Sequence, residues 1–374
     1  MNSNIEVILI SQSPLPFSKI GSWTTLYENY FKDNNHKIDY IVCPKPEEKY
    51  QGIKYSFAVL TFWHKLQRKF LKRKNLEYFE ALDKIIVPNK KYIIQIVDNY
   101  GMVKPLKRYL ISKRFAEQSY IQFFYHGYLP YFNQNSGRDF YEIIDELIVL
   151  TNDSYQEYKK RINTLPIYFS VLHNGIDSEK FNTISDFEKI TLKRELGFED
   201  KKVFVWCSND RPKKGLHLIL AAWRTVYSEH KNCVLLVIGN SSRQKKIDGV
   251  FFLGKISNEE LPKYYQASDC YLFPTLCQEG FGLSLIEALH CGNYCIASAL
   301  GGVPEVLQYG KIGKLIENPH FVSEWEVAIN EFIRGNSKSP KIESTLYSAK
   351  KWNGGMNKII DDAKNRVANN LIQL

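Results

Sequence analysis

The chain has 374 residues, more than one hydrophobic core usually supports, so two domains are expected. Apolar residues make up 44% of it, an ordinary share for a folded globular protein, and no apolar run approaches the roughly 20 residues that a helix needs to cross a bilayer. The formal net charge of +10 favours a negatively charged partner, such as a nucleotide, a membrane surface or a nucleic acid.

The start of the chain and its cysteines indicate a cytoplasmic protein. The first apolar run, residues 5–10, is too short for a signal peptide and lacks a cationic lead. The seven cysteines are odd in number and never form Cys-x-x-Cys; most (Cys207, Cys233, Cys270 and Cys295) fall in apolar, strand-like runs. They are typical of reduced core residues rather than zinc ligands, so no metal site is predicted.

Strand-like runs alternate with helical patterns along the whole chain, which predicts the α/β class with parallel sheets covered on both faces by helices. Strands are expected near residues 7–10, 37–42, 92–97, 120–125, 146–151 and 167–172, and then near 203–207, 234–238, 250–253, 270–273 and 294–297. A turn-rich segment at residues 173–177 separates the two series. We therefore predict one domain over residues 1–174, a second over 175–351 and a closing helical segment over 352–374.

Two features of the first half follow predicted strands. Gly21 and Ser22 come after the first strand, where a glycine can simply start a helix or can let the backbone approach a ligand. His126 ends the strand at 120–125, and a histidine there is either a packed, hydrogen-bonded ring or a site residue.

The densest basic cluster, residues 64–74, alternates cations with Trp63, Leu66, Phe70 and Leu71 at helical spacing. Two interpretations stay open. In one, a helix packs its apolar side on the core and exposes a solvated basic face. In the other, the helix lies on the surface of an anionic membrane. No recognised nucleic-acid-binding motif is present, so nucleic acid is not expected as a partner.

A second cationic segment follows the strand at 203–207 and precedes a helix. It carries Arg211, Lys213 and Lys214, with Gly215 directly after them. Cations and backbone N–H groups at such a turn can neutralise a diphosphate. The other interpretation is an exposed basic loop.

Two glutamates with seven residues between them, Glu279 and Glu287, are the most informative feature of the chain. Glu279 follows the strand at 270–273, in a turn with Gly280 and Gly282, whereas Glu287 lies inside the helix that begins near Leu283. Free N–H groups at a helix start bind anions, and a carboxylate beside them accepts hydrogen bonds from hydroxyls. A sugar joined to a phosphate suits both groups.

With these residues the chain resembles the retaining glycosyltransferases of family 4, which have the GT-B fold and carry a glutamate–seven residues–glutamate signature of this form. The resemblance extends over about residues 200–320, because the segments 250–261, 265–269, 296–298, 301–305 and 310–313 look like family counterparts in order and spacing. It implies two Rossmann-like, doubly wound domains facing an interdomain cleft. The first would bind the acceptor and the second the sugar nucleotide, with the last helix crossing back onto the first.

The resemblance also implies a role for each residue of the donor site. Glu279 would contact the donor sugar next to the reacting carbon, with His126 near the same sugar. Glu287 would bind the ribose hydroxyls. The backbone of Gly280, Phe281, Gly282 and Leu283 would contact the sugar or phosphate, and Gly254, Lys255 and Ile256 would lie near the nucleobase.

For the donor diphosphate, the resemblance implies Arg211 and Lys214, together with Gly21 and Ser22 of the first domain. Lys214 matches the family's lysine closely, whereas the family's arginine usually lies about two residues upstream of Arg211. Only Gly21 remains of the usual glycine pair. No Asp-x-Asp occurs in the sequence, which agrees with transfer that needs no metal or other cofactor.

The expected function is a retaining transfer of a sugar from a UDP- or GDP-linked donor to a glycan or glycolipid. Surface polysaccharide or lipopolysaccharide assembly in the cytoplasm, at the inner face of the plasma membrane, would suit such an enzyme. Two alternatives stay open: a nucleotide-sugar epimerase of the same fold, and a non-catalytic subunit that binds sugar nucleotides.

Overall fold

In a computed structural model the chain forms two compact units. The structure describes residues 5–17, 23–70, 74–132, 137–166, 168–240, 246–337 and 339–369. Unit 1 comprises Met1–His173 and Ala349–Leu374, and unit 2 comprises Asn174–Ser348. The chain passes from unit 1 to unit 2 after His173, one residue before the predicted boundary at 174. It returns to unit 1 after Ser348, three residues before the predicted boundary at 351.

Unit 1 is built on a seven-stranded parallel sheet in the order β3-β2-β1-β4-β5-β6-β7. Its strands are β1 (Ile5–Ile10), β2 (Tyr40–Cys43), β3 (Lys54–Phe57), β4 (Lys91–Val97), β5 (Ser119–Phe124), β6 (Glu146–Val149) and β7 (Tyr168–Val171). Because β1 lies inside the sheet and the chain crosses from β3 back to β4, the sheet is doubly wound. Side chains on both of its faces are buried, which explains why β4 and β5 are almost continuously apolar.

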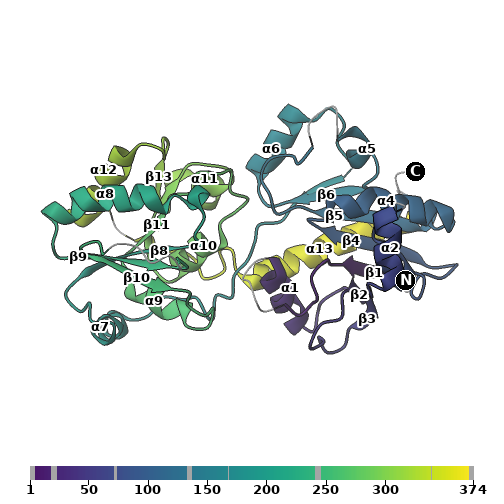
Figure 1. Ribbon diagram of the computed structural model, residues 1–374, viewed down its shortest axis with the longest axis horizontal. Helices are drawn as coiled ribbons and strands as arrows, with labels where there is room; N and C mark the ends of the chain where they lie inside the picture. The colour runs from purple at the N-terminus through teal and green to yellow at the C-terminus, as the bar shows by residue number, and fades with distance from the viewer. Residues whose placement is uncertain are drawn as a thin grey trace. The chain divides into compact units, whose positions relative to one another are not determined.

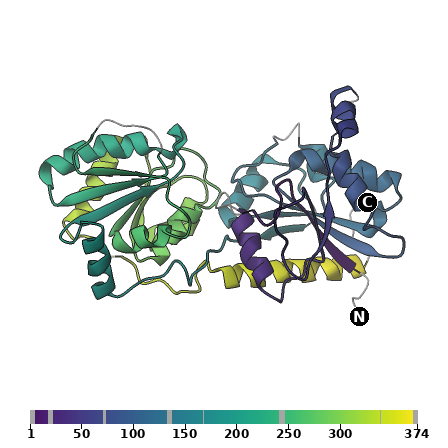
Figure 2. The same ribbon diagram turned by 60° about the horizontal axis from the view of Figure 1, so that its bottom comes forward.

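Helices surround this sheet. They are α1 (Trp23–Lys32), α2 (Phe62–Phe70), α3 (Leu76–Leu82), α4 (Tyr100–Ser112), α5 (Arg138–Tyr141), α6 (Asn152–Arg161) and α13 (Ala349–Ala368). The last of them, α13, packs against α1, β1 and β4, as its yellow ribbon shows in Figures 1 and 2. Its buried face carries Trp352, Met356, Ile360, Ala363 and Val367 at helical spacing.

Unit 2 repeats the arrangement with six parallel strands in the order β10-β9-β8-β11-β12-β13. They are β8 (Lys202–Cys207), β9 (Cys233–Ile238), β10 (Val250–Gly254), β11 (Cys270–Phe273), β12 (Tyr294–Ser298) and β13 (Lys314–Ile316). Its helices are α7 (Asp186–Glu195), α8 (Leu216–Glu229), α9 (Leu261–Ala267), α10 (Leu283–His290), α11 (Val303–Val306) and α12 (Val322–Ile333). Figure 1 shows α8 and α12 on one face of the sheet, and α7, α9 and α10 on the other.

The predicted α/β class with two doubly wound sheets is confirmed. Each predicted strand is present, although β2 begins at Tyr40 rather than near residue 37. Two strands escaped prediction, β3 and β13, and each lies at an outer edge of its sheet. Such short, partly exposed edge strands lack the continuous apolar run that marks the buried ones.

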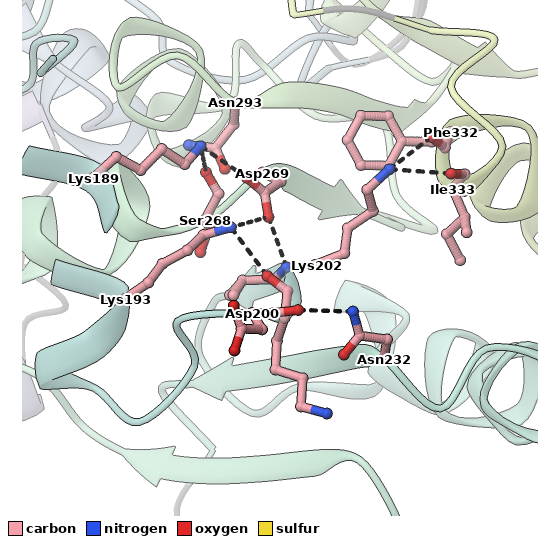
Figure 3. A network of polar contacts seen from close by, with 12 residues as sticks. Lys189, Lys193, Asp200, Lys202, Asn232, Ser268, Asp269, Asn293, Phe332 and Ile333 are labelled. Atoms are coloured by element: carbon pink, nitrogen blue, oxygen red, sulfur yellow. Dashed lines mark hydrogen bonds and ion pairs between the residues drawn. The ribbon is translucent and has the colours of Figure 1, made fainter. Parts of the chain in front are cut away.

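A charged network fixes the start of β11 in unit 2 (Figure 3). Asp269, directly before β11, accepts a hydrogen bond of 2.8 Å from the backbone N–H of Val203. Its two carboxylate oxygens also pair with Lys189 at 2.9 Å and Lys193 at 2.6 Å, both from α7. The network therefore joins α7 to β8 and β11 at the amino end of the sheet.

The exposure of the apolar residues of α2 decides against one of the two interpretations of the basic cluster, the helix packed on the core. Phe62, Trp63 and Phe70 are 72%, 67% and 68% exposed, so the apolar side of the helix does not pack on the core. The buried residue of this helix is His64, whose Nε2 lies 2.8 Å from Glu80 Oε1. The interpretation as a core-packed amphipathic helix is therefore wrong, and residues 71–73 of the cluster lie outside the described residues.

Candidate functional site

In each unit the carboxyl ends of two central strands mark the point where the winding of the sheet reverses. In unit 2 this point lies between β8 and β11, and in unit 1 between β1 and β4. Ligands of open α/β sheets bind in the crevice outside such strand ends. The predicted residues of unit 2 lie in the turns after β8 and β11, in the first part of α10 and at the end of β10.

The turn after β8 is pressed against the end of β11. Trp206 donates from its indole Nε1 to the carbonyl of Lys214 at 3.3 Å, and the N–H of Leu276 donates to the carbonyl of Lys213 at 2.8 Å. Gly215 has a φ of +71°, and a Cβ there would lie 1.8 Å from the carbonyl oxygen of Pro274. Only glycine fits this position, so the packing of the two turns requires the glycine that follows Lys214.

This packing brings together the lysine and the first glutamate that the sequence singled out. Lys214 Nζ lies 2.5 Å from Glu279 Oε2, and the two side chains are 20% and 21% exposed. The ammonium group also lies 5.9 Å from the centroid of the Phe273 ring. An ammonium and a carboxylate in contact at a strand end can bind the phosphate and the hydroxyls of one small ligand.

The backbone of Glu279 is held by the glycine pair that follows β12. The N–H of Gly302 donates to the carbonyl of Glu279 at 2.8 Å. Gly301 has a φ of +68°, and a Cβ there would lie 2.2 Å from the same carbonyl oxygen. Three loops, from β8, β11 and β12, thus fix the position of this carboxylate.

The first turn of α10 begins beside Glu279. Gly282, with a φ of +89°, precedes the first helical residue, Leu283. The Phe281 side chain is 1% exposed and packs edge-on against Tyr347, with 5.2 Å between ring centroids. A ligand at this site would therefore contact the backbone of Phe281 rather than its side chain. It would also meet the first N–H groups of α10, which have no carbonyl acceptor within the helix.

Glu287 lies one turn into α10, below the same strand ends. Burial raises its pKa to about 7, and the nearby Lys180 ammonium offsets part of that increase. Burial is the main cause that raises the pKa of the Cys207 thiol at the end of β8, and the nearby Glu287 carboxylate raises it further. Tyr271 connects these elements, since its hydroxyl lies 2.9 Å from Ser284 Oγ and 3.1 Å from the Cys207 carbonyl.

The residues predicted near the nucleobase occupy the same edge of the sheet. Gly254 is the last residue of β10, and its carbonyl accepts from the N–H of Gly239 at 2.6 Å. In turn, a Cβ on Gly239 would lie 2.2 Å from the Ser208 carbonyl oxygen, so the ends of β8, β9 and β10 are tightly packed. Lys255 is exposed just beyond them, and Ile256 follows it.

Arg211 lies apart from the Lys214–Glu279 pair. Its side chain is exposed and lines a hollow of about 1120 Å³ beside α8. Among the described residues that line this hollow, neither Lys214 nor Glu279 occurs. The two cations predicted to grip the same diphosphate therefore border different surfaces, and Gly21 and Ser22 lie outside the described residues.

In unit 1, His126 lines a hollow of about 490 Å³ at the carboxyl ends of β4 and β5. Its backbone N–H donates to Asp98 Oδ1 at 2.8 Å, and its Nδ1 lies 3.2 Å from Asp98 Oδ2. The imidazole packs on Phe124, with 4.4 Å between ring centroids. Both ring nitrogens are buried and have no hydrogen-bond partner within the described part of the chain.

Sequence reasoning missed Asp98 of this hollow. Asp98 adopts a φ of +51°, an uncommon conformation for a residue other than glycine. Its position directly after the predicted strand at 92–97 was an available signal, the same one that singled out His126. Tyr131 is 63% exposed and stacks on Tyr100, with 4.1 Å between ring centroids.

Metal coordination finds no support in the described ranges. Across them, no three His, Cys, Asp or Glu side chains gather as a metal ion would require.

Comparison with known proteins finds similarity to one family in the second half of the chain. The family model described as glycosyl transferases group 1 matches residues 188–352. The chain is 34% identical over 137 residues to an N-acetyl-alpha-D-glucosaminyl L-malate synthase of Bacillus anthracis, covering 34% of this chain and 35% of that protein. It is 27% identical over 209 residues to a D-inositol 3-phosphate glycosyltransferase of Mycobacterium ulcerans, covering 52% of this chain and 43% of that protein.

Among solved structures, the Anabaena HepE protein in complex with UDP-glucose matches 96% of this chain and 99% of its own, with a TM-score of 0.71 and 16% identity. This similarity establishes the GT-B fold. The matched part of the chain spans only about half the length of the curated relatives, or less.

Proposed function

We propose that the chain is a group 1 glycosyltransferase, the family whose model matches residues 188–352, and that it transfers a sugar from a nucleoside diphosphate to an acceptor hydroxyl. The transfer proceeds with retention at the anomeric carbon and without a metal. The observation that carries the proposal is the contact between Lys214 and Glu279 beside the start of α10.

The main chemical demand of this transfer is the negative charge that develops on the leaving diphosphate. The bond between the anomeric carbon and the distal phosphate oxygen breaks, and its electron pair leaves with the phosphate. The Lys214 ammonium and the N–H groups at the start of α10 stabilise this charge. The acceptor oxygen bonds to the anomeric carbon on the same face, and its proton passes to the leaving phosphate oxygen.

The carboxylates orient the donor on either side of that diphosphate. Glu279 accepts hydrogen bonds from sugar hydroxyls and favours the positive charge that the ring gains in the transition state. Glu287, one turn into α10, accepts from the ribose hydroxyls. The protein cations take the place of a divalent ion at the diphosphate, with Lys214 in the central role.

The first donor to test is UDP-glucose, the ligand named for the Anabaena HepE complex. Purified protein is incubated with a panel of UDP- and GDP-sugars and a crude lipid and glycan extract as acceptor. Appearance of the nucleoside diphosphate with a labelled glycan or glycolipid supports the proposal. A changed sugar nucleotide without acceptor identifies an epimerase, and bound but unconsumed donor identifies a binding subunit. Either outcome refutes the proposed transfer.

We also propose that α2 holds the protein on an anionic membrane, which places it at the inner face of the plasma membrane, in polysaccharide or lipopolysaccharide assembly. Phe62, Trp63 and Phe70 present a large apolar surface, with the exposed Lys65, Arg68 and Lys69 among them. Aromatic side chains with interspersed cations bind the interface of anionic lipids. No helix of the described residues has the length and hydropathy of a bilayer span.

Vesicle flotation tests the membrane contact. The protein should float with phosphatidylglycerol vesicles, and less with phosphatidylcholine vesicles. The double variant Trp63→Ser/Phe70→Ser should lose at least tenfold in the floating fraction. Phe187→Ser, at a 79% exposed position of unit 2, is the matched control and should float as the wild type does. Equal flotation of the α2 variant would refute this contact.

A further inference from the structure

The hollow of unit 1 has a lining that differs in chemistry from the donor site proposed on unit 2. It has a volume of about 490 Å³ and lies at the carboxyl ends of β4 and β5. The described residues that line it all belong to unit 1. They combine an acidic side chain with several rings and include Asp98, Tyr100, Tyr125, His126 and Tyr131.

The Tyr131 ring presents one open face. Its other face packs on Tyr100, with 4.1 Å between ring centroids and 17° between ring planes. Because Tyr131 is nevertheless 63% exposed, the face away from Tyr100 is open to solvent. Tyr100 packs in turn on Phe132 and on Phe123, and Phe123 is fully buried. The core therefore supports the open ring from behind, and turning the ring away would break this stack.

Hydrogen bonds to the backbone hold the loop that carries this ring. The Tyr125 hydroxyl donates to the carbonyl of Leu129 at 3.0 Å. From α6, Ser154 Oγ donates to the carbonyl of Tyr128 at 2.6 Å. A Cβ on Gly127 would lie 2.0 Å from the Tyr125 hydroxyl oxygen, so a larger residue there would displace the Tyr125 ring. A ring that is already fixed in place loses little conformational entropy when a ligand packs on it.

Asp98 supplies a hydrogen-bond acceptor to the same hollow. Its side chain is 34% exposed, and its Oδ1 accepts from the backbone N–H of His126 at 2.8 Å. An ionised carboxylate offers about four acceptor positions, so Asp98 can also accept from hydroxyl groups of a ligand. Its φ of +51° is uncommon for a residue with a side chain, and such conformations concentrate at binding and active sites.

An open aromatic face beside a carboxylate matches the chemistry of a sugar ring. One face of a pyranose consists of C–H groups, which pack on an aromatic ring by dispersion and by removal of apolar surface from water. The rim of the pyranose carries hydroxyls, which donate to a carboxylate. We propose that this hollow binds a neutral pyranose ring of the acceptor, which stacks on Tyr131 and donates a hydroxyl to Asp98.

The assignment to the acceptor rests on the proposed function, in which Lys214 and Glu279 of unit 2 hold the donor. It narrows the class of acceptor to a glycan or glycolipid that presents an uncharged sugar ring. The Asp98 carboxylate would repel a carboxylate or a phosphate in the same place, and a purely apolar acceptor would leave it without a donor.

Methyl glycosides of glucose, galactose, mannose and N-acetylglucosamine are the probes for this proposal. Saturation-transfer difference NMR measures their binding to the full chain in the absence of any donor. At least one glycoside should bind saturably, with the strongest signals from the ring C–H protons that face Tyr131. Binding should persist when either UDP or UDP-glucose is added, because the donor occupies another site.

Variants of the hollow locate the binding. Tyr131→Ala should weaken it roughly tenfold, whereas Tyr131→Phe keeps the ring face and should bind nearly as the wild type does. Gly101→Leu fills the hollow at an exposed position of α4, where the nearest side-chain atom to a Cβ is Asn99 Oδ1 at 3.7 Å. It should also weaken binding, with the thermal midpoint of unfolding unchanged. Tyr309→Ala, at an equally exposed tyrosine of unit 2, is the matched control.

Three results would overturn the proposal. The first is that none of the four glycosides binds saturably, and the second is that Tyr131→Ala binds as the wild type does. The third is displacement of the glycoside by UDP-glucose but not by UDP, which would assign the hollow to the donor sugar.

These binding measurements need no turnover, so their outcome is distinguishable from a failure of the proposed transfer. A chain that binds a glycoside at Tyr131 but transfers no sugar would retain the pyranose site and lose the proposed function. Where transfer is observed, Tyr131→Ala should raise KM for the acceptor roughly tenfold, with KM for the donor unchanged.

Discussion

Strand β11 of unit 2 carries a lysine–carboxylate cluster at each of its ends, and the two clusters differ in how completely they are satisfied. At the amino end, Asp269 pairs with Lys189 and Lys193 and accepts from a backbone N–H. At the carboxyl end, Glu279 pairs with Lys214 alone among the described residues. Both carboxylates have nearly the same exposure, 20% and 21%.

The difference shows that burial and charge pairing do not by themselves mark a functional site. Asp269 accepts from two ammonium groups and a backbone N–H, and these partners come from the elements that the network fastens together. Glu279 and Lys214 keep acceptor and donor positions free at the edge where parallel α/β sheets bind ligands. The two clusters therefore differ in which end of β11 they occupy and in how many partners the carboxylate has. These two properties distinguish the structural cluster at Asp269 from the candidate site at Glu279.

The largest effect that this comparison predicts is on Glu279. Glu279→Ala should lower transfer by roughly 10²–10³-fold, because the variant loses the group that orients the donor sugar and favours its positive charge. Initial rates with the donor identified by the panel measure this. The fold should be intact, as checked by an unchanged circular dichroism spectrum. Near-normal turnover would contradict the role of Glu279.

Asp269→Asn should affect stability instead. Removal of its charge leaves two lysines without their carboxylate, and the free energy of unfolding at pH 7 should fall by about 3 kcal/mol. Burial acts to raise the pKa of Asp269, but Lys189 and Lys193 hold it below its ordinary value. The stabilisation is therefore present above the unfolded-state pKa near 4 and is lost as the pH falls below it.

Urea unfolding at pH 7 and at pH 3 measures this prediction. The difference between wild type and Asp269→Asn should shrink at the lower pH. Glu331→Gln is the control, because it breaks an ion pair with Lys314 in which both side chains are 43% exposed, and such pairs contribute less than about 1 kcal/mol. Equal destabilisation by the two variants would remove the distinction between a buried network and a surface pair.

Much of this arrangement was predictable from the sequence. The buried strands are apolar runs that a periodicity analysis finds, and parallel strands place their carboxyl ends at one edge. The sequence analysis placed Lys214 and Glu279 in turns after two strands of one sheet, but their direct contact across 65 residues was not predicted. By contrast, Asp269 looked like any other member of a matching segment, because its partners on α7 are about 80 residues away in the chain.

Other features depend on packing that no local pattern reports. The apolar residues of α2 have the same spacing whether they face the core or the solvent, so only the structure shows that they are exposed. Arg211 and Lys214 are neighbours in sequence, yet the short helical turn between them directs the two side chains to different surfaces.

A smaller effect is expected at the other partner of the candidate site. Lys214→Ala should weaken binding of UDP roughly tenfold, because one charge-assisted contact to the diphosphate is lost, while binding of uridine stays unchanged. Isothermal titration calorimetry measures both ligands. Lys213→Ala removes an exposed neighbouring cation and should have a smaller effect. An unchanged affinity of Lys214→Ala for UDP would exclude this lysine from the diphosphate site.

The smallest effect concerns Glu287, the partly buried carboxyl on α10. Because burial raises its pKa from an ordinary 4.5 to about 7, the folded state holds a proton there that the unfolded state releases. The wild type should therefore lose stability as the pH rises through this interval, on the order of 1 kcal/mol for a partly exposed group. Glu287→Gln should not show this loss, and urea unfolding at pH 5 and pH 8 compares the two proteins.

The same titration connects stability to donor binding. The ionised carboxylate is the better acceptor for two ribose hydroxyls, so UDP should bind more tightly to the wild type as the pH rises through about 7. Glu287→Gln also serves as the reference for the titration of the UDP phosphate, which affects both proteins equally. A parallel pH dependence of UDP affinity in the two proteins would place the ribose elsewhere and would leave Glu287 with a structural role, like that of Asp269.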